Sequence, residues 1–154
     1  MRTNRGFTLI ELMVTIAVLA IIAMMAAPSL GLLLEKQRFQ GKERELLSVL
    51  AQTKSQAILK RTNTTVNLNS TSANTDTAIN WDKGANITLT IQTLSSSQTL
   101  GSYSGTSLIF DKNGLVSSLS QDALISLCNS KLKKKKQLVL TRLGAVYTKP
   151  EGAC

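Results

Sequence analysis

The feature that most constrains this chain is an apolar segment near its N-terminus, which runs from Phe7 to Leu34. Between Leu12 and Leu34 the only polar residues are Thr15 and Ser29. At about 1.5 Å of rise per residue, a helix of this length crosses the ~30 Å hydrocarbon core of a bilayer. Arginines precede the segment, and positive flanks stay on the cytoplasmic side. The segment therefore predicts a single-pass helix with the rest of the chain outside the cytoplasm.

A cleaved secretory signal peptide is the alternative, because it also combines a basic start, an apolar middle and small residues, here Ala26 and Ala27. Three features favour a retained segment. The apolar run continues past these alanines to Leu34, Glu11 interrupts its core, and Gly6 offers a different cleavage point. We therefore expect the segment to stay attached.

Residues 5–14, RGFTLIELMV, resemble the processing motif of type IV prepilins and type II secretion pseudopilins. The resemblance implies that a prepilin peptidase cuts between Gly6 and Phe7 and methylates Phe7. It also implies that Glu11 pairs with the amine of a neighbouring subunit's first residue and sets the register of a filament. An unpaired carboxylate in apolar surroundings is costly, which gives this register its physical basis. Pro28 lacks an amide donor and is expected to kink the helix.

Residues 35–61 form the second, amphipathic half of the predicted helix. Phe39, Leu46, Leu50 and Ile58 recur at helical spacing and give an apolar stripe about one face wide. We predict one long helix over roughly residues 7–60, whose outer half lays this stripe on a sheet.

From Thr62 the composition shifts to Thr, Ser, Asn and β-branched residues. Alternating runs predict strands at 64–69, 78–82, 86–93, 107–111, 123–128, 137–142 and 145–149. Turn signals at 111–114 and 143–144 predict hairpins. The expected fold is α+β, a long N-terminal helix packed on an antiparallel sheet or small β-sandwich. The expected divisions are a leader (1–6), a transmembrane or filament-core half-helix (7–34), an amphipathic half-helix (35–61) and a β-rich domain (62–154).

The two cysteines, Cys128 and Cys154, stand in a chain that has no histidine. Two thiols without histidine do not make an ordinary four-ligand zinc site, so neither a metal nor a cofactor is expected. A disulfide fits an oxidising compartment better. Closing this loop is worth about 3–4 kcal/mol in the chain-entropy model.

A run of lysines stands out in a chain whose formal charge is +9. Such a run binds phosphate backbones, rests near anionic lipid headgroups, or forms a solvated loop between two strands that protects a sheet edge. The candidate DNA or anion contacts are Lys131, Lys133, Lys134, Lys135, Lys136 and Arg142.

Nothing in the sequence supports an enzyme. The stretch GSYSG at 101–105 approaches a nucleophile elbow, but its centre is Tyr103 and the chain has no histidine to serve as base. The aspartates are scattered through turn sequences, where this residue is common.

A single helix followed by a β-rich domain resembles the GspH/FimT branch of minor pilins and pseudopilins. The stretches that carry this likeness are ELLSVLAQTKSQAILKR (45–61), SLIFDKNGLVSS (107–118) and QLVLTRLGAVYT (137–148). FimT-type members used for DNA uptake have a basic glycine-arginine motif on the last hairpin. Here Ala145 and Tyr147 stand where those arginines are expected, which favours a FimU-like assembly role.

The resemblance implies a low-abundance minor pilin that primes pilus assembly and is incorporated in the pilus. Its expected partners are other minor pilins, the major pilin, the prepilin peptidase and the inner membrane. Its expected location is the inner membrane with a periplasmic C-terminal domain, and then the pilus on the cell surface. Two alternatives stay open: a GspH-type pseudopilin of type II secretion, and a minor pilin that binds DNA for natural transformation.

Overall fold

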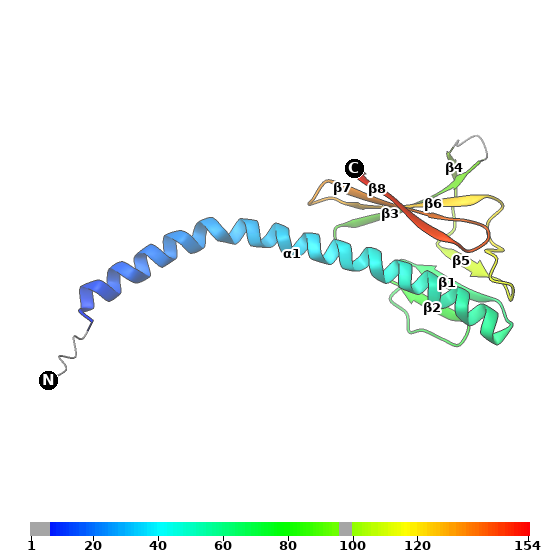
Figure 1. Ribbon diagram of the computed structural model, residues 1–154, viewed down its shortest axis with the longest axis horizontal. Helices are drawn as coiled ribbons and strands as arrows, with labels where there is room; N and C mark the ends of the chain where they lie inside the picture. Colours follow the sequence, from blue (N-terminus) through cyan, green and yellow to red (C-terminus); the bar gives the residue numbers. More distant parts are fainter. Residues whose placement is uncertain (1–6, 96–99) are drawn as a thin grey trace. The chain divides into compact units, whose positions relative to one another are not determined.

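The computed structural model describes residues 7–95 and 100–154, without the side chains of residues 25–28. Within these residues the chain forms one helix, α1 (Leu9–Lys60), followed by a series of strands (Figure 1). The strands are β1 (Thr64–Leu68), β2 (Ala78–Trp81), β3 (Ile87–Leu94), β4 (Leu100–Ser102), β5 (Ser107–Phe110), β6 (Asp122–Asn129), β7 (Lys134–Leu140) and β8 (Val146–Ala153). The α+β fold class, with a long N-terminal helix and largely antiparallel sheets, is therefore confirmed.

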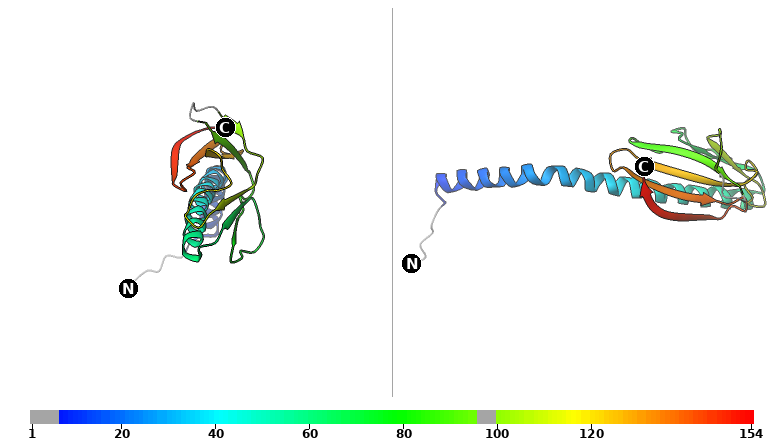
Figure 2. Two further views of the ribbon diagram at one scale, coloured as in Figure 1. Left: turned by 90° about the vertical axis from the view of Figure 1, so that its right-hand side faces the viewer. Right: turned by 90° about the horizontal axis from the view of Figure 1, so that it is seen from above.

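The chain divides into two units, Met1–Gln37 and Arg38–Cys154, which are described separately. The described part of the first unit is the apolar half of α1. The second unit combines the rest of α1 with two sheets, whose strand orders are β2-β1-β5 and β4-β3-β6-β7-β8 (Figures 1 and 2).

One hydrophobic cluster joins the helix to both sheets in the second unit. From α1 come the buried side chains of Phe39, Leu46 and Leu50, which belong to the predicted stripe. The three-stranded sheet adds Val66, Leu68, Trp81, Leu108 and Phe110, and the five-stranded sheet adds Ile87, Ile91, Ala123, Ile125, Leu127, Leu138 and Leu140. The amphipathic half of α1 thus supplies one side of the core.

The pairing of β1 with β2 departs from the antiparallel expectation, because these two strands are parallel. Their connection is short, and Asn80 of β2 makes three hydrogen bonds, two to the connecting segment and one to β1. The Asn80 backbone N–H donates to Asn74 Oδ1 at 2.7 Å, and its side-chain amide donates to the Ala73 carbonyl at 2.8 Å. The Asn80 side-chain oxygen accepts from Asn67 Nδ2 at 3.0 Å. These bonds hold a parallel neighbour without a crossover helix.

The two predicted hairpin turns have different outcomes. The turn at 143–144 joins the antiparallel pair β7 and β8, as predicted. The turn at 111–114 forms after β5, but its returning segment makes only an isolated bridge between Phe110 and Val116. Strand β4 was not predicted, because its three residues are too few to show an alternating pattern.

Candidate functional site

The start of α1 has a built N-cap around the predicted register residue Glu11. Thr8 precedes the helix, and its hydroxyl accepts the backbone N–H of Glu11 at 3.3 Å, while its carbonyl accepts that of Leu12 at 3.2 Å. Glu11 is therefore the third helical residue, where the positive end of the helix dipole favours a carboxylate. Phe7 is 80% exposed, and Gly6 lies outside the described residues. The roles predicted for Gly6, Phe7 and Glu11 stay predictions.

Every described apolar side chain between Phe7 and Leu34 is exposed. In the described residues no single stretch of helix passes as a membrane span by itself. Leu9–Met24 and Ser29–Lys60, which meet at 45°, have the length and composition for one when taken together. The bend falls at the segment that contains Pro28, whose side chain lies outside the described set, so the predicted kink stays a prediction.

The predicted disulfide joins Cys128 of β6 to Cys154, 26 residues later, with 5.8 Å between their Cα atoms. The bond ties the end of β8 to the middle of its own sheet. Cys154 also donates its backbone N–H to the Lys133 carbonyl at 3.2 Å. The C-terminal residue is thus fixed beside the lysine run.

Only part of the lysine run lies in a loop between two strands, because Lys134, Lys135 and Lys136 lie within β7. Only residues 130–133 turn the chain from β6 to β7. Asn129 shapes this turn, since its Oδ1 accepts the backbone N–H groups of Lys131 at 3.0 Å and of Leu132 at 2.9 Å. The solvated loop was one of three interpretations of the run, and it is wrong for the three lysines in β7, because their strand pairs with β6 and β8.

Strand alternation divides the lysines between two faces of the sheet. Lys136 Nζ lies 2.8 Å from Glu43 Oε2 of α1, and their side chains are only 17% and 13% exposed. Lys134 Nζ lies 2.6 Å from Glu151 Oε1, and Lys136 is 3.6 Å from the other oxygen of the same carboxylate. An ion pair this sheltered is screened by salt less than a surface pair is. Two of the five lysines therefore have a structural role.

The pKa values of this network shift in the directions that favour the charged forms. A hydrogen bond to Glu43 raises the pKa of Lys136 above its ordinary value, against a smaller opposing effect of burial. A hydrogen bond from Lys134 lowers the pKa of Glu151.

Arg142 does not join the lysines in one site. Six residues separate it from Lys136 along β7 and the following turn, which is about 20 Å of extended chain. Its backbone N–H donates to Asp122 Oδ1 at 2.9 Å, and its carbonyl accepts from the Val116 N–H at 2.8 Å. Arg142 therefore lies apart from the lysines, and its role as a DNA or anion contact stays a prediction.

The two predicted glycine turns, at 111–114 after β5 and at 143–144 between β7 and β8, touch each other, and sequence reasoning missed this contact. Gly114 and Gly144 both have positive φ, +78° and +69°, and each donates its N–H to the carbonyl three residues earlier at 2.9 Å. A Cβ on Gly144 would collide with the Gly114 carbonyl oxygen, so the two turns touch. The shared pattern of DKNGLV and TRLGAV shows that the two turns are alike, but it does not show that they touch.

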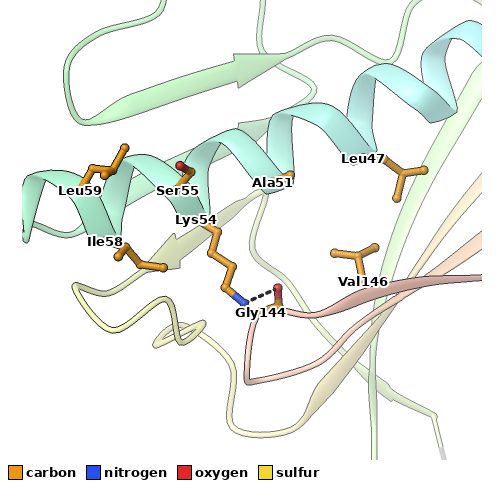
Figure 3. Close-up of a pocket in the computed structure, with 8 residues that line it drawn as sticks. All are labelled: Leu47, Ala51, Lys54, Ser55, Ile58, Leu59, Gly144 and Val146. Atoms are coloured by element: carbon orange, nitrogen blue, oxygen red, sulfur yellow. Dashed lines mark hydrogen bonds between the residues drawn. The ribbon is translucent and has the colours of Figure 1, made fainter.

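Lys54 of α1 fastens this hairpin. Its ammonium donates to the carbonyls of Leu143 at 3.0 Å and Gly144 at 3.1 Å. Beside it lies an apolar groove of about 530 Å³ between α1 and the hairpin (Figure 3). Its lining is Leu47, Ala51, Lys54, Ser55, Ile58, Leu59, Gly144 and Val146. This arrangement can bury apolar surface of a partner.

Within the described residues no group of three or more His, Cys, Asp or Glu side chains is placed to hold a metal ion.

Comparisons with known proteins identify two family models. The prokaryotic N-terminal methylation motif matches residues 1–27, and the type II transport protein GspH matches residues 44–144. No curated protein and no solved structure matches the chain.

Proposed function

The chain belongs to the GspH family of type IV pilin-like proteins, and we propose that it is a minor type IV pilin which primes pilus assembly and is incorporated in the pilus. Members of this family are structural subunits rather than enzymes. The methylation motif implies processing by a prepilin peptidase, anchoring in the membrane and assembly with other pilins. Incorporation in a pilus, low abundance and the roles of individual residues go beyond family membership and are our proposal.

One observation carries the proposal: the processing motif leads directly into a helix whose described apolar side chains are exposed as far as Leu34. Exposed apolar surface of this extent needs a bilayer or a bundle of like helices to cover it. Glu11 at the third helical position then meets either the membrane interface or the amine of a neighbour's Phe7. Pairing it in the wrong register would leave a carboxylate uncompensated in apolar surroundings.

The test replaces Glu11 with alanine and measures incorporation into purified pili. Thr15→Ala is the matched control, because Thr15 lies one turn further on and its hydroxyl donates to the Leu12 carbonyl at 2.8 Å. We expect both variants to insert in the inner membrane, and only Glu11→Ala to be depleted from pili. Normal incorporation of Glu11→Ala would refute the register argument.

The N-terminus of the mature protein tests the processing step independently. Mass spectrometry should find an N-methylated Phe7 as the first residue. A mature chain that begins near Ser29 would refute the proposal, because the apolar segment would then have been removed.

A pseudopilin of type II secretion is the second candidate, favoured by the description of the matched family as type II transport proteins. It shares the anchor and the fold, so a deletion strain separates the two. Loss of pili supports the minor pilin, and loss of exoprotein release with intact pili supports the pseudopilin.

A further inference from the structure

The second unit has an apolar groove of about 530 Å³ between α1 and the β7–β8 hairpin (Figure 3). Leu47, Ala51 and Ile58 line it from α1, and their spacing of four and seven residues places them along one face of the helix. Val146 lines it from β8 and points toward Leu47. This face of α1 lies beside the buried stripe of the same helix, so its apolar surface extends beyond the part that the core buries.

Part of the groove's apolar surface is open to solvent. Leu59 is 79% exposed and Ile58 44%, and Leu143, which precedes Gly144 of the lining, is 71% exposed. Exposed apolar surface that is contiguous and rimmed by polar groups marks interaction sites. The groove can therefore receive apolar side chains from another molecule.

The charged residues that line the groove and the hollow next to it are all basic. Lys54 lines the groove, and a hollow of about 550 Å³ that shares Ile58 with it adds Arg61 and Lys112. Within the described residues none of these three cations makes an ion pair. The groove is therefore apolar along its length and positively charged at its rim.

Two acids lie close to these cations, and both have other partners. Asp111 Oδ1 accepts the backbone N–H groups of Asn113 at 2.8 Å and of Leu115 at 2.9 Å. Asp76 Oδ1 lies 3.3 Å from the ammonium of Lys60. Carboxylates that complement the rim must therefore come from a partner.

Lys54 presents a hydrogen-bond donor in the middle of the apolar lining. An ammonium group has three N–H donors. Two of them go to the carbonyls of Leu143 at 3.0 Å and Gly144 at 3.1 Å, and Figure 3 shows the side chain reaching from α1 to the hairpin. The third N–H has no further acceptor among the described residues, and a carboxylate would make the strongest bond to it.

We propose that this groove binds an amphipathic helix of another protein, with large apolar side chains on one face and carboxylates beside them. Three turns of such a helix match the roughly 16 Å of α1 between Leu47 and Ile58. Apolar anchors one turn apart are the usual basis of helix-in-groove recognition. One carboxylate accepts from Lys54, and others face Arg61 and Lys112, which complements the charge of the rim.

A second copy of this chain fits the groove less well. The chain carries a formal charge of +9, and in a symmetric contact the same three cations would face each other. The inference goes beyond the proposed function and does not depend on it, because the groove lies wholly within the second unit.

The experiment measures the binding of a fluorescent peptide to the full chain by anisotropy. The peptide has about 14 residues, or about four helical turns, with leucine on one face, glutamate elsewhere and a side-chain cross-link that holds it helical. A non-ionic amphipathic polymer keeps the chain in solution, and the polymer alone is the blank. A peptide with glutamine in place of glutamate should bind about tenfold more weakly. Added salt should weaken the binding of the glutamate peptide only.

Ala51→Glu tests the site, and Gln52→Glu is the matched control. Both variants add a carboxylate at an exposed position of α1, but only Ala51 lines the groove. Because the new carboxylate repels those of the peptide, Ala51→Glu should weaken binding at least about tenfold, while Gln52→Glu should bind as the wild type does. Thermal unfolding of both variants checks that the fold is kept.

The double variant R61Q/K112Q tests the rim, with K131Q/K133Q as the matched control. Each removes two cations that make no ion pair within the described residues, and each includes one position of positive φ, Arg61 at +52° and Lys133 at +53°. R61Q/K112Q should associate more slowly and bind about fivefold more weakly, whereas K131Q/K133Q should keep the wild-type affinity.

The outcomes that overturn the proposal are distinct from those that bear on the retained anchor. Failure of both peptides to bind, equal binding of both, or unchanged binding by Ala51→Glu would overturn it. Native mass spectrometry of the chain without peptide should show a monomer. A dimer that Ala51→Glu abolishes would overturn the proposal in favour of a second copy as the occupant. None of these results changes the mature N-terminus or the incorporation into pili, which test the proposed function.

Discussion

Replacing Gly144 with alanine tests whether the two glycine turns are stacked as described. Gly144 has φ +69°, a conformation that costs an L residue about 1–2 kcal/mol. A Cβ there would also collide with the Gly114 carbonyl oxygen and approach Lys54 Cδ at 3.1 Å. The oxygen belongs to backbone, so relief requires the two turns to move apart. Overpacking of this kind adds about 1–3 kcal/mol.

Gly84→Ala is the matched control for the backbone cost alone. Gly84 has φ +75°, but a Cβ there meets only Lys42 Cε at an ordinary 3.5 Å. We expect Gly84→Ala to lower the free energy of unfolding by about 1–2 kcal/mol, and Gly144→Ala by about 2–5 kcal/mol. The difference between the variants measures the contact between the turns.

The assay is thermal unfolding of the full chain in detergent, followed by circular dichroism. One kcal/mol corresponds to about 4 °C in a domain of this size, so Gly144→Ala should melt several degrees below Gly84→Ala. Equal melting temperatures for the two variants would refute the stacking of the turns and the close approach of Gly114 to Gly144.

Three further predictions concern the disulfide, ion pairs and hydrogen bonds that stabilise the second unit. Reducing the bond between Cys128 and Cys154 should lower the free energy of unfolding by about 3–4 kcal/mol, and an unchanged melting temperature in reductant would contradict this. Glu151 has a lowered pKa, so its stabilisation is present above the ordinary value of 4.5 and is lost as the pH falls. Glu151→Gln should therefore be less stable than the wild type near pH 7, and the gap should close in acid; a gap independent of pH would refute the ion pair. The raised pKa of Lys136 acts oppositely, so its stabilisation is lost only as the pH rises beyond about 10.5. Lys54→Met should cost about 1.5–3 kcal/mol in urea unfolding, because two carbonyls lose a charged donor, and a wild-type midpoint would contradict it.

Local pattern was enough to predict much of this fold. The seven predicted strand runs all overlap observed strands, because alternating β-branched residues fit a pleated, half-buried surface. The stripe through Phe39, Leu46 and Leu50 is buried as helical spacing implies. Cys128 and Cys154 were the only cysteines, so their pairing followed once the domain was placed outside the cytoplasm.

The parallel pairing of β1 and β2 could not be predicted from the local sequence pattern. Its determinant is Asn80, whose amide and backbone reach Asn67 in the next strand and the loop around Asn74. An asparagine in a strand is usually unfavourable, and nothing in its immediate neighbours signals this role. The hydrogen bonds of Lys54 to the β7–β8 hairpin could not be predicted either, since their acceptors lie about 90 residues away in the sequence.

The lysine run shows most clearly why charge patterns are difficult to interpret from sequence. Five lysines in six positions were compatible with a nucleic-acid contact, a lipid contact or a solvated loop between strands. In the fold, β7 alternates its side chains between faces, so Lys136 turns inward to a glutamate 93 residues earlier, while Lys135 turns outward. Within the same short segment, Lys136 therefore joins the sheet to α1 through Glu43, while Lys131, Lys133 and Lys135 make no ion pair within the described residues.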